Sequence, residues 1–338
     1  MSSIRRRAFL PSGSLSGTKS AGSTRWVGKS GTRPPYARPV ESTFEPIRVG
    51  LVGAGPWASA VHAPAIAGHP ATTLVGVWAR RPQAAHDLAA AHRAEPFADV
   101  DELIAACDAV AFAVPPAVQA ELATAAAAAG RHLILEKPIA ADLDAAARLA
   151  DAVETTGVAS VVVLTLRFAP ETKTWLADVR SRGGWRGGTA RWLSGVLLGG
   201  DFSASPWRHS DGALADLGPH VFDLLDSAIG EVTEVHAAHR TDPDLWHVVL
   251  GHRGGASSTA SMSLKLPLIP TIISVDVYGD SGHSEFGGRS SSSLDSFAVL
   301  LDEFAEQVRG GRSDHPLGVR RGLQLQRVLH QARRLAQV

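Results

Sequence analysis

The sequence predicts an α/β protein in which a doubly wound parallel sheet is followed by an α+β domain with a mostly antiparallel, open sheet. From Ile47 to Leu164, short β-branched runs alternate with alanine-rich segments of helical length, which is typical of βαβ units around a parallel sheet. After Arg167, longer segments rich in Thr, Ser and Val alternate by twos, as strands with one buried face do. With 338 residues, 45% of them hydrophobic, the chain can form two sizeable cores.

The same periodicities place the individual elements. In the first half we expect strands at 47–53, 73–78, 109–114, 132–135 and 158–164, and helices at 57–68, 82–92, 99–106, 117–129 and 142–155. Asp142 is a suitable N-cap for the last of these helices. In the second half we expect strands at 188–196, 232–240, 246–252, 256–264 and 272–278, a polar loop at 281–293, and closing helices at 294–309 and 317–335. The predicted domains are therefore 46–166 and 167–338, and the last helix has the length to pack back on the first domain.

Residues 1–45 have a different composition. Ser, Gly, Arg, Lys and Pro dominate from Ser12 to Pro39 without apolar periodicity, so we expect a disordered N-terminal extension. Arg6-Arg7 resembles the start of a twin-arginine export signal, but the polar sequence after Leu10 lacks the apolar region that such a signal needs. A start extended beyond the folded protein explains this segment better, and we expect a cytoplasmic protein.

Charge and composition narrow the class of partner. Lys+Arg and Asp+Glu both number 33, which gives no reason to expect nucleic acid or an acidic membrane as a partner. No run approaches the roughly 20 apolar residues that cross a bilayer. The single cysteine, Cys107, lies in an apolar stretch and cannot form an intramolecular disulfide. We expect a small-molecule ligand.

A glycine-rich turn follows the first expected strand. The sequence Gly53-Ala54-Gly55-Pro56-Trp57-Ala58 is a variant of the dinucleotide-binding fingerprint, with Ala58 in place of the third glycine. The first glycine permits the tight turn, and the second allows the backbone to approach a pyrophosphate at the N-terminus of the next helix. The position between a strand and a helix favours a Rossmann domain, with Gly53, Gly55, Pro56 and Trp57 as cofactor-binding candidates.

The end of the second expected strand bears on which dinucleotide binds. An NAD-binding protein usually carries Asp or Glu there for the ribose 2′-hydroxyl, and this chain has Ala79-Arg80-Arg81 instead. Guanidinium groups pair bidentately with phosphate, so these residues favour the 2′-phosphate of NADP. NAD stays possible, because Arg80 and Arg81 could instead be solvated residues at the start of a helix.

Glu136-Lys137-Pro138 ends the fourth expected strand. Proline fixes φ and disfavours a helix that starts on the lysine, so the ammonium of Lys137 is left at the carboxyl edge of the sheet. In open α/β sheets ligands bind at that edge. A lone Lys-Pro would more often be a solvated surface pair, so the surrounding motifs carry the argument.

Three further motifs join this tripeptide in a fixed order. They are Val114-Pro115-Pro116, Leu166-Arg167-Phe168-Ala169-Pro170, and Trp207-Arg208 followed by Asp216-Leu217-Gly218-Pro219-His220. In this order and spacing the chain, from about Ile47 to Val338, resembles the glucose-fructose oxidoreductase, inositol dehydrogenase and rhizopine-catabolism family, usually called Gfo/Idh/MocA.

The resemblance implies roles for these residues. Lys137, Asp216 and His220 would be catalytic, and Val114, Pro115, Glu136 and Lys137 would contact the cofactor beside the glycine turn. Arg167, Trp207 and Arg208 would contact substrate, and the sheet of the second domain would form a homodimer or homotetramer.

The residue chemistry independently supports the catalytic roles. Hydride removal from a carbinol carbon needs a base for the hydroxyl proton, and an imidazole such as His220 is suited to that near neutral pH. Asp216, four residues earlier on an expected helix that starts near Leu214, shares its face. Lys137 would stabilise negative charge on the reacting oxygen or relay its proton. A surface pair of Asp216 and His220 is the alternative that these motifs together disfavour.

These observations predict an NAD(P)-dependent oxidoreductase that moves a hydride between nicotinamide and a carbinol or carbonyl carbon of a polyol, sugar or related molecule. Two alternatives stay open: a redox-neutral glycoside hydrolase or eliminase with the same cofactor, and a non-catalytic NADP-sensing protein. We predict no metal site, because His236, His239, His247 and His252 have no Cys or clustered acid at ligand spacing.

Overall fold

The first half of the chain forms a parallel sheet. The computed structural model describes residues 44–200 and 202–337, so the predictions for residues 1–43 lie outside it. The central strand β1 (Ile47–Val52) pairs in parallel with β2 (Thr72–Trp78) and β4 (Ala109–Phe112). The strand order is β3-β2-β1-β4-β5-β6, completed by β3 (Glu95–Pro96), β5 (His132–Leu135) and β6 (Ser160–Val162). The order reverses between β1 and β4, where ligands bind in doubly wound sheets.

Helices connect these strands in the expected places. The π-helix η1 (Ala58–His62) continues into α1 (Ala63–Gly68), and α2 (Pro82–His92), α3 (Val100–Ala106), α4 (Pro116–Ala128) and α5 (Leu143–Thr156) follow. Asp142 is the N-cap of α5, as expected: its Oδ1 accepts a hydrogen bond of 2.8 Å from the N–H of Ala145. Asp99 caps α3 in the same way through the N–H of Asp101.

The second half forms a mostly antiparallel sheet with the strand order β12-β11-β7-β10-β9-β8. The strands are β7 (Trp185–Leu193), β8 (Val232–Thr241), β9 (Leu245–His252), β10 (Ser257–Ser263), β11 (Ile272–Gly279) and β12 (Gly282–Phe286). The pair β7 and β10 runs in parallel and the other pairs are antiparallel. The fold class expected from the sequence is confirmed.

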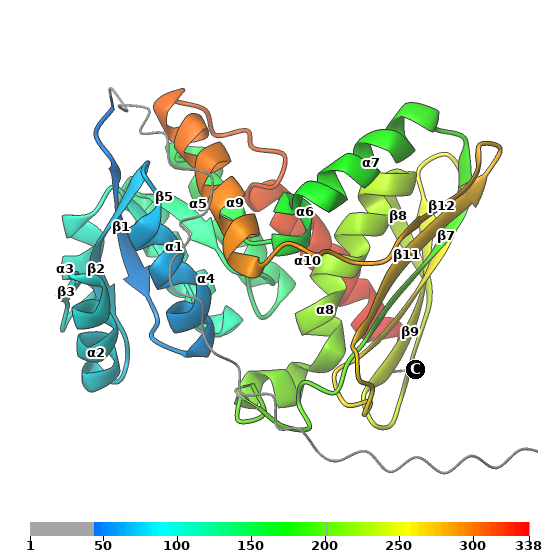
Figure 1. Ribbon diagram of the computed structural model, residues 1–338, viewed down its shortest axis with the longest axis horizontal. Coiled ribbons are helices and arrows are strands. Elements are labelled where there is room, and N and C mark those ends of the chain that lie inside the picture. Colours follow the sequence, from blue (N-terminus) through cyan, green and yellow to red (C-terminus); the bar gives the residue numbers. More distant parts are fainter. Residues whose placement is uncertain (1–43, 201, 338) are drawn as a thin grey trace, which may run out of the picture. The chain divides into compact units, whose positions relative to one another are not determined.

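The long helix α8 (Pro206–Ile229) packs against this sheet, which it contacts along β7 and β10 (Figure 1). The other helices of this half are α6 (Thr165–Phe168), α7 (Pro170–Arg182), α9 (Ser293–Arg309) and α10 (Val319–Leu335), of which α7 and α10 contact α8. Helix α10 contacts α5 of the first half and α8 of the second, while α9 contacts η1 and α1. The side chain of Ile139, which follows β5, packs closely against Gly322 of α10.

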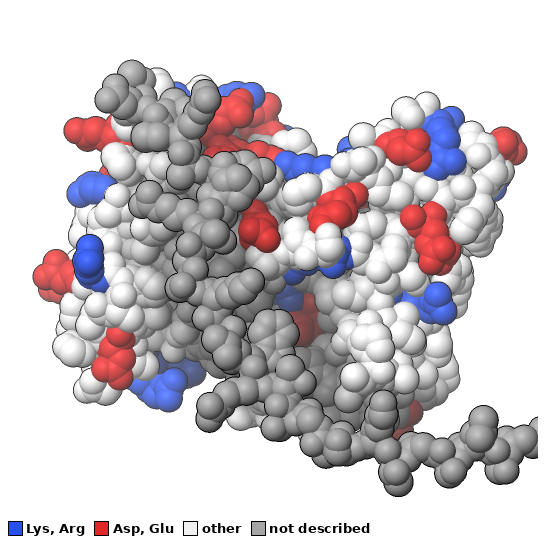
Figure 2. Space-filling view, viewed as in Figure 1, with Lys and Arg blue, Asp and Glu red and all other residues white. Residues whose placement is uncertain are grey.

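The face of the molecule in Figure 2 carries Lys and Arg side chains interspersed with Asp and Glu. This mixture agrees with the equal numbers of basic and acidic residues in the sequence. Among the described residues, none of the helices combines the length and the hydrophobicity that a membrane span requires.

Two local expectations were wrong. The segment 281–293 is not entirely a loop, because Gly282–Phe286 forms the edge strand β12 through antiparallel pairing with β11. The expected strand 158–164 is shorter, because β6 covers only Ser160–Val162 and Thr165–Phe168 forms the short helix α6. Helix α8 begins at Pro206 but is interrupted at Gly212, and its second part, from Ala213, agrees with the expected start near Leu214.

Candidate active site

A pocket of about 300 Å³ lies at the carboxyl ends of the central strands, beside the point where the strand order reverses. We call it the glycine-turn pocket. It is lined by Gly53, Ala54, Gly55, Trp78, Ala79, Arg80, Arg81, Ala84, Ala113, Val114, Pro115 and Val118. The lining thus brings together seven of the predicted cofactor-binding residues from three separate strand ends. Pro56, Trp57, Glu136 and Lys137 are not among its lining residues.

The two glycines of the turn serve different purposes. Gly53 has a φ of +121°, and a Cβ there would lie 2.4 Å from the carbonyl oxygen of Ala113, so a side chain cannot be accommodated. A Cβ on Gly55 would meet nothing within 4 Å, because this residue faces open space in the pocket. The first glycine is needed for the turn between adjacent strands, and the second leaves room for a ligand to approach the backbone, which fits a dinucleotide pyrophosphate.

The end of β2 supplies cationic side chains to the same pocket. Arg80 and Arg81 are both exposed, and Trp78 and Ala79 form the adjacent apolar wall. None of the described lining residues is Asp or Glu. The pocket therefore offers guanidinium groups and backbone amides, which suit the phosphates of a nucleotide.

Glu136 is held in place from two directions. Its Oε1 accepts hydrogen bonds from Trp57 Nε1 at 2.6 Å and from His62 Nε2 at 2.8 Å, both on the helix that follows the glycine turn. Gln119 on α4 bonds its main chain, donating from Nε2 to the carbonyl at 2.7 Å and accepting from the N–H at 2.8 Å. The backbone that carries Lys137 is therefore fixed on both sides, and His62, on which no functional prediction was made, acts as a support.

Lys137 reaches from the end of β5 to α8. Its Nζ donates to the carbonyl oxygen of Asp216 at 2.8 Å and to Asp216 Oδ1 at 2.6 Å. Asp216 Oδ2 accepts from Arg208 Nε at 3.1 Å, and the Arg208 guanidinium lies over the rings of Phe202 and Trp207. Burial alone would raise the pKa of Asp216, but the charges of Lys137 and Arg208 outweigh it and hold the pKa at about 2.

One N–H of the Lys137 ammonium has no acceptor among the described residues. An ammonium group has three donors, and Asp216 takes two of them. A substrate oxygen beside Lys137 could therefore accept the third hydrogen bond without displacing the ion pair.

His220 lies one turn after Asp216 on α8, as the spacing predicts. The residue is 6% exposed, and its ring is 5.4 Å from the ring of Trp192 on β7. Burial, and then the positive charge of Lys137, lower the pKa of His220 well below its usual range. The buried Nδ1 has no hydrogen-bond partner among the described residues. The imidazole is therefore neutral near pH 7 and available as a proton acceptor.

A special turn sets the direction of the helix that carries these two residues. Gly212, inside α8, has a φ of +68°, so the helix is interrupted before Asp216. Asp244 caps the second part, because its Oδ2 accepts from the N–H of Ala213 at 2.7 Å while its Oδ1 accepts from Trp246 Nε1. The segment with Trp207 and Arg208 can therefore fold back over Asp216.

Arg167 lies in a different place from the Lys137 group. Its guanidinium donates to Asp223 Oδ2 at 3.1 Å and to the Ser227 hydroxyl, about two helical turns beyond Asp216 on α8. The structure thus brings Lys137, Asp216, His220 and Arg208 together and places Arg167 in a separate ion network. Its predicted contact with substrate stays a prediction.

Several residues of the site were not found from the sequence. Gln119, Trp192 and Asp244 each come from elements remote in sequence from the residues they contact, and Phe202 lies in the irregular segment before α8, under the guanidinium of Arg208. Their types are common in cores and turns, so no spacing signal marks them. Among the described residues, no group of three or more His, Cys, Asp or Glu could hold a metal ion.

Comparison with protein-family models gives two adjacent matches. Residues 47–164 match the model described as "Oxidoreductase family, NAD-binding Rossmann fold", and residues 186–285 match the "GFO/IDH/MocA C-terminal domain". The chain belongs to the Gfo/Idh/MocA oxidoreductase family. The resemblance expected from the motifs is confirmed, and the N-terminal domain is an NAD(P)-binding Rossmann domain.

Several curated relatives of this Gfo/Idh/MocA protein are named as sugar or polyol dehydrogenases. Galactose 1-dehydrogenase of Pseudomonas fluorescens is 32% identical over 195 residues, which cover 57% of this chain and 58% of that protein. Inositol 2-dehydrogenase of Rhizobium meliloti is 31% identical over 189 residues, which cover 55% of this chain and 56% of that protein. The chain thus spans a little over half the length of these two relatives.

Solved structures share the fold over most of the chain. GenD2 from gentamicin A biosynthesis, in complex with NAD, has a TM-score of 0.78 at 22% identity and covers 91% of this chain and 97% of its own. KijD10, a 3-ketoreductase from Actinomadura kijaniata in complex with NADP, has a TM-score of 0.68 at 20% identity and covers 86% and 98%. These likenesses establish the fold of the Gfo/Idh/MocA protein.

Proposed function

We propose that this protein is an NAD(P)-dependent dehydrogenase that oxidises a hydroxyl of a sugar or polyol, or reduces the corresponding ketone. The observation that carries the proposal is the contact of Lys137 with Asp216 beside a buried, neutral His220, close to the strand edge that bears the glycine-turn pocket. The curated sugar and polyol dehydrogenases among the relatives support the substrate class.

The residues divide the chemistry as follows. The dinucleotide, when bound, accepts or supplies the hydride at its nicotinamide ring. His220 accepts the proton of the substrate hydroxyl, since burial keeps its ring uncharged at neutral pH. Lys137 donates its remaining N–H to the same oxygen and stabilises the negative charge that develops there. Asp216 and Arg208 hold Lys137 in position, and Trp192 fixes the plane of the imidazole.

A substrate panel tests the proposal. Purified protein is incubated with NAD or NADP and with galactose, myo-inositol, glucose 6-phosphate and related polyols, and reduced nicotinamide is followed by absorbance while products are identified by mass spectrometry. We expect reduced cofactor to accumulate in a one-to-one ratio with a ketone or lactone. Conversion of a glycoside without net reduction would instead favour the redox-neutral alternative, and binding of cofactor without any turnover would favour the sensing protein.

We also propose a preference for NADP over NAD. Arg80 and Arg81 line the glycine-turn pocket at the end of β2, the position at which NAD-binding domains usually carry a carboxylate. A guanidinium contact with a 2′-phosphate contributes enough to change affinity at least about tenfold. Fluorescence titration of the Arg80→Ala, Arg81→Ala double variant should therefore show weakened NADPH binding and unchanged NADH binding. Equal weakening of both would assign the two arginines to a general role.

We propose in addition that the sheet of the second domain mediates a homodimer or homotetramer. Its strands present polar side chains that pair across neighbouring strands, such as Thr189 with Thr259 and His247 with Ser261. Light scattering after size exclusion measures the assembly directly. Arg191→Glu, on β7 of the same sheet, should shift an assembly that uses this surface to the monomer, and the proposal fails if the mass of the wild-type protein is that of one chain.

A further inference from the structure

We propose that a second pocket, formed mainly by arginines, binds a phosphate or the phosphoryl group of a small molecule. This arginine pocket has a volume of about 430 Å³. It is lined by Arg167, Arg180, Asp226, Ser227, His315, Pro316, Leu317, Arg320, Arg321 and Gln324. Four guanidinium groups from α6, α7 and α10 thus meet one lining carboxylate, around the C-terminal end of α8.

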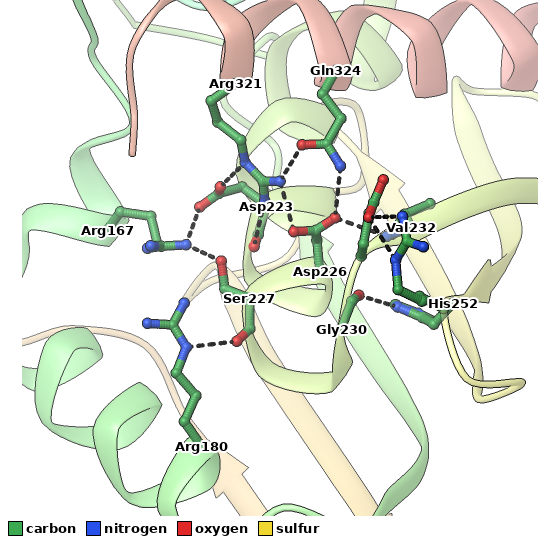
Figure 3. Close-up of polar contacts among 12 residues, drawn as sticks. Arg167, Arg180, Asp223, Asp226, Ser227, Gly230, Val232, His252, Arg321 and Gln324 are labelled. Atoms are coloured by element: carbon green, nitrogen blue, oxygen red, sulfur yellow. Dashed lines mark hydrogen bonds and ion pairs between the residues drawn. The ribbon is translucent and has the colours of Figure 1, made fainter. Parts of the chain in front are cut away.

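The floor of the arginine pocket is a buried ion network (Figure 3). Asp223, which is fully buried, accepts from Arg321 Nε at 2.7 Å and from Arg167 NH1 at 3.1 Å. Arg321 also donates to Asp226 Oδ1 at 2.6 Å, and Gln324 donates to the other oxygen of that carboxylate. These bonds occupy the nitrogens of Arg321 and both carboxylates, so the network is rigid and its acids are already paired.

The walls of the pocket retain unused donors. Arg180 donates from Nε to the carbonyl oxygen of Ser227 at 3.0 Å, and its two terminal nitrogens have no acceptor within residues 44–200 and 202–337. Arg167 donates hydrogen bonds from NH1 to Asp223 and Ser227, and its NH2 has no acceptor within the same residue ranges. Figure 3 shows both guanidinium groups converging on Ser227 from α6 and α7. Partial burial, and then the charge of Arg167, lower the pKa of Arg180. An anion bound between the two guanidinium groups would offset their repulsion.

The start of α10 adds to the positive potential. Arg320 and Arg321 lie in the first turn of this helix, which contains no acidic residue. Helix N-termini carry a partial positive charge and favour anions, so the end of α10 that carries these two arginines also favours an anion. Arg321 is neutralised by the buried network. Arg320 has a side chain 80% exposed and bonds Glu154 on α5 through Nε.

The charges and geometry favour a tetrahedral oxyanion. Arg167, Arg180, Arg320 and Arg321 carry four positive charges, against three negative charges on Asp223, Asp226 and Glu154. A carboxylate offers two oxygens in one plane and suits a single guanidinium fork. Donors that approach from three helices suit a phosphate, whose oxygens point in different directions. The Ser227 hydroxyl between Arg167 and the Arg180 wall is a further group that can bond such an oxygen.

The arginine pocket is separate from the proposed catalytic group. Asp223 follows Asp216 by seven residues on α8, a distance of roughly 10 Å along the helix axis. The two pockets share no lining residue. A phosphoryl ligand bound beside the C-terminal end of α8 would therefore occupy a site outside the proposed catalytic group. Binding at this site can be tested whether or not the protein is a dehydrogenase.

Isothermal titration with inorganic phosphate tests the site. The full chain is titrated at constant ionic strength in chloride, once alone and once in the presence of excess NADPH, which covers any phosphate site at the glycine turn. We expect saturable binding of one phosphate in both cases, and at least about tenfold weaker binding in Arg180→Gln, because one charge-assisted contact is lost. Arg320→Gln, a change on the surface, should weaken binding in the same direction.

Arg182→Gln is the matched control, because it removes a partly exposed arginine from the same helix that is paired with Asp178 outside the pocket. The proposal is overturned if phosphate does not saturate, or if Arg180→Gln and Arg182→Gln bind it equally well. Glycerol phosphate in place of inorganic phosphate distinguishes the source of the anion, since tighter binding of the ester would assign the pocket to a phosphorylated metabolite.

Discussion

Asp216 is the residue on which the charges of the proposed catalytic group depend. Its carboxylate lies between Lys137 and Arg208, and its pKa of about 2 means that it stays ionised throughout the working pH range. Asp216→Asn would leave two partly buried cations without their shared anion. Such a loss costs about 3 kcal/mol or more of unfolding free energy, measurable by urea denaturation with an unchanged m-value.

The matched control for this change is Asp280→Asn. Asp280 pairs with Arg186 in a salt bridge whose side chains are both well exposed, and such pairs contribute at most about 1 kcal/mol. If Asp216→Asn were no more destabilising than Asp280→Asn, the buried ion pair would not stabilise the fold in the way that its geometry indicates.

At the scale of one helix, Gly212 determines how α8 presents Asp216 and His220. The residue has a φ of +68°, and a Cβ there would lie 2.5 Å from Asp244 Oδ1. Gly212→Ala should therefore strain the backbone, displace the Asp244 cap, and lower the unfolding free energy by at least about 1 kcal/mol. Gly68→Ala is the comparison, because its Cβ would meet nothing within 4 Å. Thermal unfolding of both variants measures this difference in stability. Equal unfolding free energies of the two variants would contradict this role of Gly212.

Elements with a clear local signal could be predicted from the sequence. The alternating runs locate β1, β5 and α2 to within a residue, and Asp142 marks the start of α5 because its side chain can cap the helix. Helix α7 (Pro170–Arg182) was not expected at all. Its sequence has few apolar residues, and tertiary contacts rather than a strong periodicity stabilise it. Edge strand β12 was not expected either, because its sequence is polar and gives no apolar alternation. Its hydrogen bonds with β11 form it in the folded protein.

Some residues of the candidate site could be predicted from the sequence and others could not. Lys137, Asp216 and His220 belong to short motifs with fixed spacing, and the two partners Lys137 and Asp216 are in contact although 79 residues separate them. The supports of the site, Gln119 and Trp192, are set by how strands and helices pack, so they follow from the tertiary structure and not from any local pattern.

For the whole molecule, buried histidines set the acid limit of stability. Burial lowers the pKa of His69, His132, His220 and His252 in the folded state. In the unfolded chain these side chains titrate near 6.5, so below that pH the unfolded state binds more protons than the folded state. Stability should be constant above about pH 7 and should fall as the pH is lowered from about 6.5 towards 5.

Urea denaturation at several pH values checks this expectation. The carboxylates do not obscure it, because those of Asp216 and Glu171, whose pKa values are held at about 2, lose their contribution to stability only as the pH falls below about 5. A denaturation midpoint that stayed constant or rose between pH 7 and pH 5 would mean that the four histidines are not buried in their neutral form.

The central claim is that Lys137 acts on the substrate of an NAD(P)-dependent dehydrogenase, and the kinetics of Lys137→Met test it most directly. With the substrate and cofactor found by the panel, we expect kcat to fall by about 10² to 10⁴-fold, the range for loss of a group that acts on the proton or charge of the reacting oxygen. The affinity for the dinucleotide should fall far less than kcat, because every residue that lines the glycine-turn pocket is unchanged. Lys173→Met, which removes a lysine paired with Glu303 on the surface, should retain full activity. A Lys137→Met variant that turned over as fast as the wild-type protein would contradict the account.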